Sequence, residues 1–317
     1  MFKKIFEKIE KYDSIIIFGH LNPDCDCFGA QVGLKEIILA EFPHKKVYLA
    51  GTGVPYVFDL LYPVDIIEDN QFKGSLGVLV DANDLSRMED SRIYNCADWV
   101  KIDHHIDTGT FKEGPFIVDT NANSACDIIA GLVMDHNLKI TKLGATALLL
   151  GIVSDSARFQ FVTNYPETFE RCKFLVEKGG EIKKVYTKLS STNEKTLRVK
   201  GYVLSHYKKS KKDNVLYIIL DQKTLQKLRV STNHASNLIN MLANVEGYPI
   251  WASFAEYEDG KVRCELRSNG PAVQPIAVKI GGGGHAQASG ASLPKLDLDY
   301  IEKIIDDLDD LVEAWRK

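Results

Sequence analysis

The sequence lacks any long hydrophobic run. Its longest nearly unbroken apolar stretch, residues 143–153, is far shorter than the ~20 residues that a bilayer-spanning helix needs. The first residues, MFKKIFEKIEKY, have neither the apolar core nor the small-residue cleavage site of a secretion signal. We therefore expect a cytoplasmic protein with no membrane partner.

Positive charge and cysteine are also scarce. Lys and Arg total 39 against 43 Asp and Glu, a net charge of −4, so no overall positive field would attract duplex DNA. The 6 cysteines, at positions 25, 27, 96, 126, 172 and 264, are scattered over 317 residues rather than grouped as in a disulfide framework. Most of them are expected to be small buried residues in a reducing compartment.

The first half of the chain alternates short β-branched runs with helical stretches. Apolar residues make up 45% and charged residues 26%, which is typical of a globular protein, and the length suggests two domains. The alternation predicts an α/β domain with a mainly parallel sheet and helices on both faces. The expected strands are 14–18, 47–50, 76–81 and 99–103, and the expected helices are 28–42, 141–154 and 166–178.

A smaller α/β domain is expected after residue 190. A polar helix and the basic run KKSKK form a predicted connector over 191–212. Three strands and two helices follow, at 215–220, 250–257 and 261–267 and at 225–242 and 297–315. We expect a catalytic domain over 1–190 and a substrate-binding domain over 213–317, with the active site in the cleft between them.

Acidic and histidine side chains gather where predicted elements end. Each of them alone is more often a turn residue or a helix cap, but four such segments in one order point to a site. Carboxylates and imidazoles at one sheet edge suit a pair of divalent cations such as Mn²⁺, and Asp81 could bridge the two. The segments are His20-Leu-Asn-Pro-Asp24-Cys-Asp26, Asp81 with Arg87 beyond it, Asp103-His104-His105, and Asp155.

These motifs resemble those of a known family. HLNPDCD, VDANDLSR, DHH and SD together resemble the DHH phosphoesterase superfamily, and GGGGHAQASG at 281–290 resembles the signature of the DHH-associated domain. The spacing is most similar to the nanoRNase and pAp-phosphatase subfamily. The resemblance implies a hydrolase that degrades RNA of two to five nucleotides and removes phosphate from 3′-phosphoadenosine 5′-phosphate (pAp).

The resemblance also implies residue roles. Catalysis would depend on His105 beside the scissile phosphate, on Asp81, and on Asp103, which would orient the histidine ligand. Two divalent metal ions would activate water, with Mn²⁺ expected and Mg²⁺ or Co²⁺ as alternatives. One ion would be held by His20, Asp24 and Asp81, and the other by Asp26, Asp81, His104 and Asp155.

Substrate contacts are expected mainly from the second domain. The glycine run can adopt unusual backbone angles and present N–H groups to a phosphate. Arg263 and Arg267 are four residues apart in a predicted strand and therefore share a face. The implied substrate-binding residues are Arg87, Arg267, Ser268, Gly282, Gly283, Gly284 and His285.

The sequence departs from the family pattern near the predicted metals. Cys25 stands where the family usually has glycine, Ala30 where serine is common, and Asp155-Ser156-Ala157 where Asp-Thr-Gly is usual. No predicted ligand is lost, so an active enzyme is expected. Cys25 and Cys27 are interpreted as buried small residues, with a soft metal ligand or an oxidisable thiol as the alternative.

Other functions stay open at this point. A phosphodiesterase for cyclic di-AMP or its linear product pApA is the main rival within the same class. A nucleotide sensor that binds without turnover is the rival from another class, and the altered fourth motif is its only support. A homodimer is compatible with the sequence, which does not determine the oligomeric state.

Overall fold

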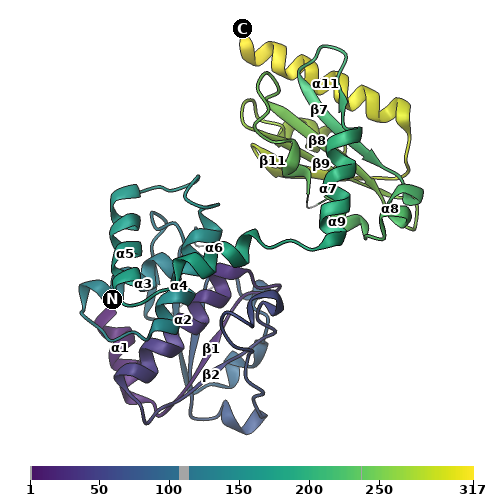
Figure 1. The fold of residues 1–317 in the computed structure, drawn as a ribbon. Helices are drawn as coiled ribbons and strands as arrows, with labels where there is room; N and C mark the ends of the chain where they lie inside the picture. The colour runs from purple at the N-terminus through teal and green to yellow at the C-terminus, as the bar shows by residue number, and fades with distance from the viewer. Residues whose placement is uncertain (1, 107–113, 237) are drawn as a thin grey trace. The chain divides into compact units, whose positions relative to one another are not determined.

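The computed structural model describes residues 2–106, 114–236 and 238–317. It divides into two compact units, Met1–Ser191 and Thr192–Lys317, which are described separately below (Figure 1). Among the described residues, no helix combines the length and the apolar character that crossing a membrane requires.

The first unit is built on a parallel sheet with the strand order β2–β1–β3–β4–β5. The four strands predicted from the sequence are confirmed to within a residue at each end. The fifth has only three residues, too few for an alternating or continuous apolar pattern to stand out. The strands are β1 (Ser14–Phe18), β2 (Lys46–Leu49), β3 (Leu76–Val80), β4 (Asp98–Asp103) and β5 (Phe116–Val118).

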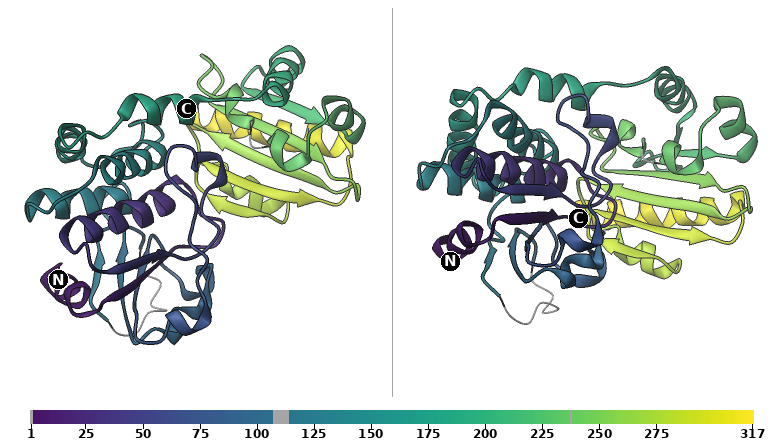
Figure 2. Two further views of the ribbon diagram at one scale, coloured as in Figure 1. Left: turned by 60° about the horizontal axis from the view of Figure 1, so that its bottom comes forward. Right: turned by 90° about the horizontal axis from the view of Figure 1, so that it is seen from below.

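One face of this sheet is covered by long helices, with α2 packed closely against α4 (Figures 1 and 2). Gly29 and Gly33 permit this approach, because a Cβ on Gly29 would lie 2.5 Å from the carbonyl oxygen of Ala147. α5 and α6 pack outside α3 and α4. The helices are α1 (Phe2–Lys11), α2 (Cys25–Glu41), α3 (Ala125–Asp135), α4 (Lys142–Asp155), α5 (Tyr165–Glu177) and α6 (Ile182–Ser190).

The opposite face is closed by short 3₁₀ helices. Phe72 and Ile93 pack there against Phe18 and Leu79 of the central strands. The prediction of helical cover on both faces is therefore confirmed, although single turns supply it on this side. The 3₁₀ helices of this unit are η1 (Pro55–Val57), η2 (Asp69–Gln71), η3 (Leu85–Arg87) and η4 (Ser91–Asn95).

The second unit contains a mixed sheet with the order β10–β11–β9–β8–β7–β6, in which only the β7–β8 pair is parallel. One core lies beneath α7, α8, α9 and η5, and the other beneath α10 and α11. The strands are β6 (Lys208–Lys209), β7 (Val215–Leu220), β8 (Ile250–Glu256), β9 (Val262–Ser268), β10 (Gly283–His285) and β11 (Ala288–Leu293). The helices are α7 (Glu194–His206), α8 (Gln222–Leu228), α9 (Thr232–Ser236), η5 (Ile239–Leu242), α10 (Gln274–Lys279) and α11 (Leu298–Arg316).

The prediction of one helix over 225–242 is wrong. α8 ends at Leu228 because Arg229 adopts a left-handed backbone (φ +57°), and the chain continues as α9 and η5. The apolar spacing that suggested one helix comes from residues such as Leu225, Ile239 and Leu242, which enter the same core from separate turns. A residue with positive φ ends a helix without any glycine to signal it.

Candidate active site

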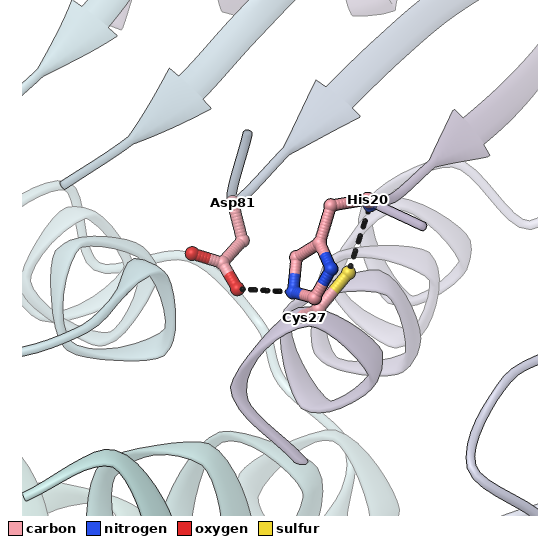
Figure 3. A group of neighbouring side chains, drawn as sticks. All are labelled: His20, Cys27 and Asp81. Carbon is pink, nitrogen blue, oxygen red and sulfur yellow. Dashed lines mark hydrogen bonds and ion pairs between the residues drawn. The ribbon is translucent and has the colours of Figure 1, made fainter. Parts of the chain in front are cut away.

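Three neighbouring strands of the first unit deliver the central side chains. His20 follows β1, Asp81 directly follows β3, and His104 directly follows β4. Because β1, β3 and β4 are adjacent and parallel, their carboxyl ends meet at one edge of the sheet. Figure 3 shows His20 and Asp81 beyond two of these strands, with their side chains directed toward each other.

The Asp81 carboxylate lies at the centre of the site and is 2% exposed. Its Oδ2 is 3.4 Å from Nε2 of His20, and its Oδ1 is 3.4 Å from Nε2 of His104. Its backbone is left-handed (φ +56°), and its N–H donates to the carbonyl of Ile102 on β4. The two oxygens of one carboxylate therefore face two different groups of side chains.

The first group contains His20 and Asp24. Nδ1 of His20 lies 3.0 Å from the carbonyl oxygen of Leu21, which directs Nε2 toward Asp81. Asp24 Oδ1 lies 3.9 Å from that Nε2 and also accepts the N–H groups of Asp26 and Cys27, so Asp24 caps α2. This cap explains why α2 begins before the predicted residue 28.

The second group contains His104, Asp26 and Asp155. Nε2 of His104 lies 4.0 Å from Asp26 Oδ2 and 3.9 Å from Asp155 Oδ2. Asp155 is the last residue of α4, and Asp26 is buried at the start of α2. Asp81 and the five other predicted metal-ligand residues therefore lie together, with Asp81 at the centre.

The sequence analysis missed the part of the site formed by α3. The carboxylate of Asp26 accepts the N–H of Ala125 at 2.7 Å and the N–H of Cys126 at 3.0 Å, both at the first turn of α3. A signal was present, because Ser124 caps this helix through the N–H of Asp127. The helix N-terminus stabilises negative charge on a carboxylate that is otherwise buried.

His105 is oriented by a buried ion pair. Asp103 Oδ1 lies 2.9 Å from Nδ1 of His105, and Asp103 Oδ2 lies 3.3 Å from Nζ of Lys101. Asp103 and Lys101 are both fully buried. The resemblance implied that Asp103 orients a ligand histidine, whereas its observed histidine contact is with His105. Lys101 was not singled out from the sequence, although a lysine two residues before the DHH aspartate falls on the same face of a strand.

A cavity of about 80 Å³ opens above these residues. That volume corresponds to only a few water molecules, which suits ions and the phosphate they would contact. Asp26 and Asp103 are not among its lining residues, but each contacts one that is: Asp26 lies near His104, and Asp103 lies beside His105. The lining comprises His20, Asp24, Asp81, Ala82, Asn83, Arg87, His104, His105 and Asp155.

The crowding of carboxylates changes their protonation. Burial, together with repulsion from Asp81 and Asp155, raises the pKa of Asp26 well above its ordinary value. Burial also raises the pKa of Asp155 to about 6. For Asp81, burial opposes ionisation, but His104 and His20 hold its pKa below the ordinary value.

The two histidines that face Asp81 respond in the opposite direction. Burial would lower the pKa of each, but the contact with Asp81 outweighs it, and the pKa rises to about 9 for both His20 and His104. Protons on the imidazoles thus balance the carboxylates. A cation placed among these groups would replace those protons.

The donor set fits divalent cations. Among the described residues, Asp81 Oδ1 is a buried oxygen with no hydrogen-bond partner. Imidazole nitrogens and carboxylate oxygens are ligands suited to first-row divalent ions. In the part of the chain that the structure describes, three groups have ligand atoms within 4.8 Å of one another: His20, Cys27 and Asp81; Asp81, His104 and His105; and Asp26, His104 and Asp155.

Cys25 and Cys27 are both buried, as predicted. Sγ of Cys25 lies 2.7 Å from the Tyr56 hydroxyl. Sγ of Cys27 accepts the backbone N–H of His20 at 3.3 Å (Figure 3), so this thiol helps to position His20 from beneath. Its place in the first donor group keeps the soft-ligand alternative open.

In the second unit, the predicted residues lie at the end of β9, on β10 and directly before β10. The Arg267 guanidinium pairs with Glu265 at 2.8 Å, and Arg263 pairs with the same carboxylate at 2.6 Å, so the two arginines share a face as predicted. Ser268 is buried, and its Oγ accepts the N–H of Gly270. Its side chain therefore supports the turn after β9. His285 is exposed on β10.

The glycine run forms part of a hairpin between β10 and β11. Gly284 has φ +133°, and a Cβ there would lie 2.7 Å from the carbonyl oxygen of Ala288, while a Cβ on Gly282 would overlap the carbonyl oxygen of Gly290. Gly283 differs from both, because a Cβ there would meet no atom within 4 Å, and its φ, unlike that of Gly284, is not positive. Packing therefore explains why positions 282 and 284 are glycine, but it gives no reason for glycine at position 283.

Comparison with known proteins supports both halves of the chain. Residues 14–152 match the DHH family, N-terminal domain, and residues 212–314 match the DHHA1 domain. The bifunctional oligoribonuclease and PAP phosphatase NrnA of Bacillus subtilis (strain 168) is 30% identical over 311 residues, 97% of each chain. The Mycoplasma pneumoniae protein of the same name is 34% identical over 304 residues, 94% of this chain and 93% of that one. The chain belongs to the DHH–DHHA1 family of bifunctional oligoribonucleases and PAP phosphatases.

A solved structure shares the DHH–DHHA1 fold. An exopolyphosphatase-related protein from Bacteroides fragilis superposes with a TM-score of 0.83 at 21% identity, over 98% of this chain and 97% of that chain. At this identity the likeness concerns the fold alone.

The departure in the fourth DHH motif has a structural consequence. Ala157, where the family usually has glycine, is left-handed with φ +48°, and Arg158 and Phe159 follow with φ +62° and +65°. A left-handed residue other than glycine costs roughly 1–2 kcal/mol. The loop is retained by hydrogen bonds, including those from Phe159 N–H to Ser156 Oγ and from Phe161 N–H to the Ser156 carbonyl. Ala157 therefore adds strain to the loop that follows Asp155.

Proposed function

We propose that this protein is a metal-dependent phosphoesterase that hydrolyses short oligoribonucleotides to mononucleotides and pAp to AMP. The observation that carries the proposal is the Asp81 carboxylate, whose two oxygens face His20 on one side and His104 on the other. The names of the relatives that match over nearly the whole chain favour this function over the cyclic di-AMP alternative.

Two divalent cations, with Mn²⁺ as the proposed species, would be held around Asp81. Histidine nitrogens among the carboxylates favour Mn²⁺ over Mg²⁺, and Co²⁺ is an alternative. When bound, such ions lower the pKa of water and neutralise charge on a reacting phosphate. The proposed ligands are His20, Asp24 and Asp81 for one ion and Asp26, Asp81, His104 and Asp155 for the other.

Two further residues of the first unit would act on the substrate. His105 is held by Asp103 through Nδ1, which leaves Nε2 free to contact a phosphate oxygen. Arg87 lines the same cavity and can donate to a second oxygen. Together they would keep the scissile phosphate in one orientation relative to the carboxylates.

The second unit would bind the part of the substrate that does not react. Gly283 offers unobstructed backbone beside the exposed His285, and Arg267 adds a positive charge to the same three-stranded region. Backbone N–H groups and a guanidinium suit a phosphate. A few such residues match a short substrate, whereas a long strand requires a groove that tracks many phosphates.

The test is a panel of substrates supplied with Mn²⁺. Initial rates would be measured for pAp, pApA, cyclic di-AMP, pyrophosphate and RNA from two to twelve nucleotides. The proposal expects turnover of pAp and of RNA up to about five nucleotides, with a sharp fall beyond. Equal rates at all lengths, or a preference for cyclic di-AMP, would contradict it, and nucleotide binding without any turnover would favour the sensor.

The remaining proposals concern the cellular context and assembly. We propose that the enzyme acts in the cytoplasm on single-stranded substrates, in keeping with a net charge of −4 that offers duplex DNA no general attraction. A homodimer is also proposed. Light scattering on the purified protein tests it, and a monomer at micromolar concentration would contradict it.

A further inference from the structure

Glu265 is a buried carboxylate in the middle of β9. Its exposed fraction is 8%, and it lies between Arg263 and Arg267, two residues from each. Side chains two residues apart on a strand share a face, so all three project from the same side of the sheet. The negative charge of Glu265 neutralises one of the two positive charges of Arg263 and Arg267, which would otherwise attract a phosphate.

The carboxylate of Glu265 joins the two arginines. Its Oε1 accepts from Nε of Arg263 at 2.6 Å and also lies 2.6 Å from Nη2 of Arg263, and its Oε2 lies 2.8 Å from Nη2 of Arg267. Charge-assisted contacts of this kind are among the stronger hydrogen bonds in proteins. Each arginine is therefore held by the same partly desolvated group.

The Arg267 guanidinium is fixed from two further directions. Its Nη1 donates to the carbonyl of Leu266 at 2.9 Å and to the carbonyl of Ser289 on β11 at 3.2 Å. A guanidinium has five N–H donors, and these contacts together with Glu265 engage three of them. Within the described residues, two donors are left for a ligand, and their direction is set by the other three.

The neighbouring strand leaves room for this arrangement. Gly290 on β11 pairs with Glu265 in the register, and a Cβ on Gly290 would lie 3.7 Å from Glu265 Oε2 and 2.7 Å from the carbonyl oxygen of Cys264. A side chain at 290 would therefore clash with the carbonyl of Cys264, whereas its distance from the Glu265 carboxylate is an ordinary van der Waals contact. The close approach of β11 to β9 thus requires glycine at 290, and the Glu265 carboxylate lies beside this glycine.

We propose that Glu265 is a positioning residue for substrate binding, which acts by holding Arg267 in the orientation that receives a substrate phosphate. The inference rests on the proposed function of Arg267. A free arginine side chain loses rotamer freedom when it binds a phosphate, so one that is already ordered binds with less loss. Removing the Glu265 carboxylate leaves the positive charge of Arg267 in place but no longer fixes the orientation of its guanidinium.

The test is a double-mutant cycle between the two residues. Glu265→Gln, Arg267→Ala and the double variant would be compared with the wild type for KM and kcat on pAp. We expect Glu265→Gln to raise KM about tenfold with kcat changed less than threefold, and to have no further effect once Arg267 is alanine. Glu246→Gln, the same change at an exposed position in the same unit, serves as the control and should leave KM unchanged.

The alternative is that Glu265 only stabilises the sheet. In that case Glu265→Gln would lower the melting temperature and would either change KM by the same factor in the wild type and in Arg267→Ala, or leave KM unaltered. Either result would overturn the proposal. If Glu265→Gln fails to fold, Glu265→Asp keeps the charge but is one methylene shorter, and the same cycle applies. The same cycle can be measured without turnover, as the affinity of each variant for AMP by calorimetry. A wild type that binds AMP but hydrolyses none of the substrates would refute the proposed function, while the AMP affinities would still test the role of Glu265.

Discussion

In Met1–Ser191 the charged residues of the candidate site are mostly carboxylates and histidines in and around a small cavity, whereas in Thr192–Lys317 they are arginines held on a sheet strand by one acid. The first arrangement keeps negative charge where water is scarce, and the histidine pKa values rise to about 9 in response. Such a site attracts cations. The second leaves a net positive charge among exposed backbone and suits an anion.

Under the proposed function, one reaction would be divided between two kinds of surface. A cation site needs several ligands from distant segments, and here the ends of parallel strands and helices supply them. A phosphate site needs fewer groups, and neighbouring residues of one hairpin and one strand would be sufficient for it. Each region can therefore be altered separately, which makes the division testable.

Removal of metal should have the largest effect. We expect a chelator to abolish hydrolysis of pAp and added Mn²⁺ to restore it. Because His20 and His104 have pKa values near 9 without metal, they are protonated at pH 7 and must release protons to bind an ion. The affinity for Mn²⁺ measured by calorimetry should therefore rise as the pH increases from 7 to 9, and an affinity independent of pH would contradict this description of the site.

Asp81→Asn should have the next largest effect. The variant keeps the shape and tolerates the left-handed backbone, but it loses the charge that faces both histidines. We expect kcat/KM for pAp to fall by more than ~100-fold, since altering the outer partners of metal ligands alone costs about 10–100-fold.

The control for Asp81→Asn is Asp84→Asn, the same change at a neighbouring aspartate whose carboxylate accepts hydrogen bonds from Ser86 and is not among the residues that line the cavity. It should stay within a few-fold of the wild type. If Asp81→Asn and Asp84→Asn had comparable activity, the proposal that two ions share the Asp81 carboxylate would be contradicted.

Gly283→Ala should affect binding in the second unit but not its folding. Its added Cβ would meet no atom within 4 Å, so the melting temperature should not change, while the methyl group would obstruct a phosphate. We expect KM for pAp to rise by about tenfold, the equivalent of one lost hydrogen bond. Gly282→Ala, whose Cβ would overlap Gly290, should instead destabilise the unit, and an unchanged KM in Gly283→Ala would place the substrate elsewhere.

Ala157→Gly should have the smallest effect, and its effect should be on stability. Glycine adopts φ +48° without strain, so the free energy of unfolding in urea should rise by about 1 kcal/mol. Ala130→Gly, in the middle of α3, is the matched control and should lower that free energy by at least a similar amount. A loss of stability in Ala157→Gly would show that the loop is not strained at this residue.

Much of the first unit could be predicted from the sequence, because its strands are continuous apolar runs that end in polar residues. β1 and β3 are the clearest cases, and His20 and Asp81 could be placed at their ends for that reason. The contribution of α3 could not be seen, since the contact between Asp26 and the N–H groups of Ala125 and Cys126 joins segments about a hundred residues apart. No local pattern encodes such a contact.

The second unit was less predictable for a related reason. The sequence places Arg263 and Arg267 on one face of a strand, but it does not show that Glu265 engages both, because strand periodicity predicts a shared face and not a side-chain contact. The glycines of the β10–β11 hairpin look alike in the sequence. Only the cross-strand register shows that Gly282 and Gly284 have packing reasons and that Gly283 has none.

The most direct test of the division between the two units is the effect of Arg267→Ala on two substrates. For pAp, we expect KM to rise roughly ten- to a hundred-fold, because a charge-assisted contact to a phosphate contributes ~1.5–3 kcal/mol. For bis-p-nitrophenyl phosphate, which offers no second phosphate to bind, kcat/KM should change less than threefold, and two Mn²⁺ should still bind per chain. Equal losses on both substrates, or loss of metal, would contradict the division of binding and chemistry between the two units.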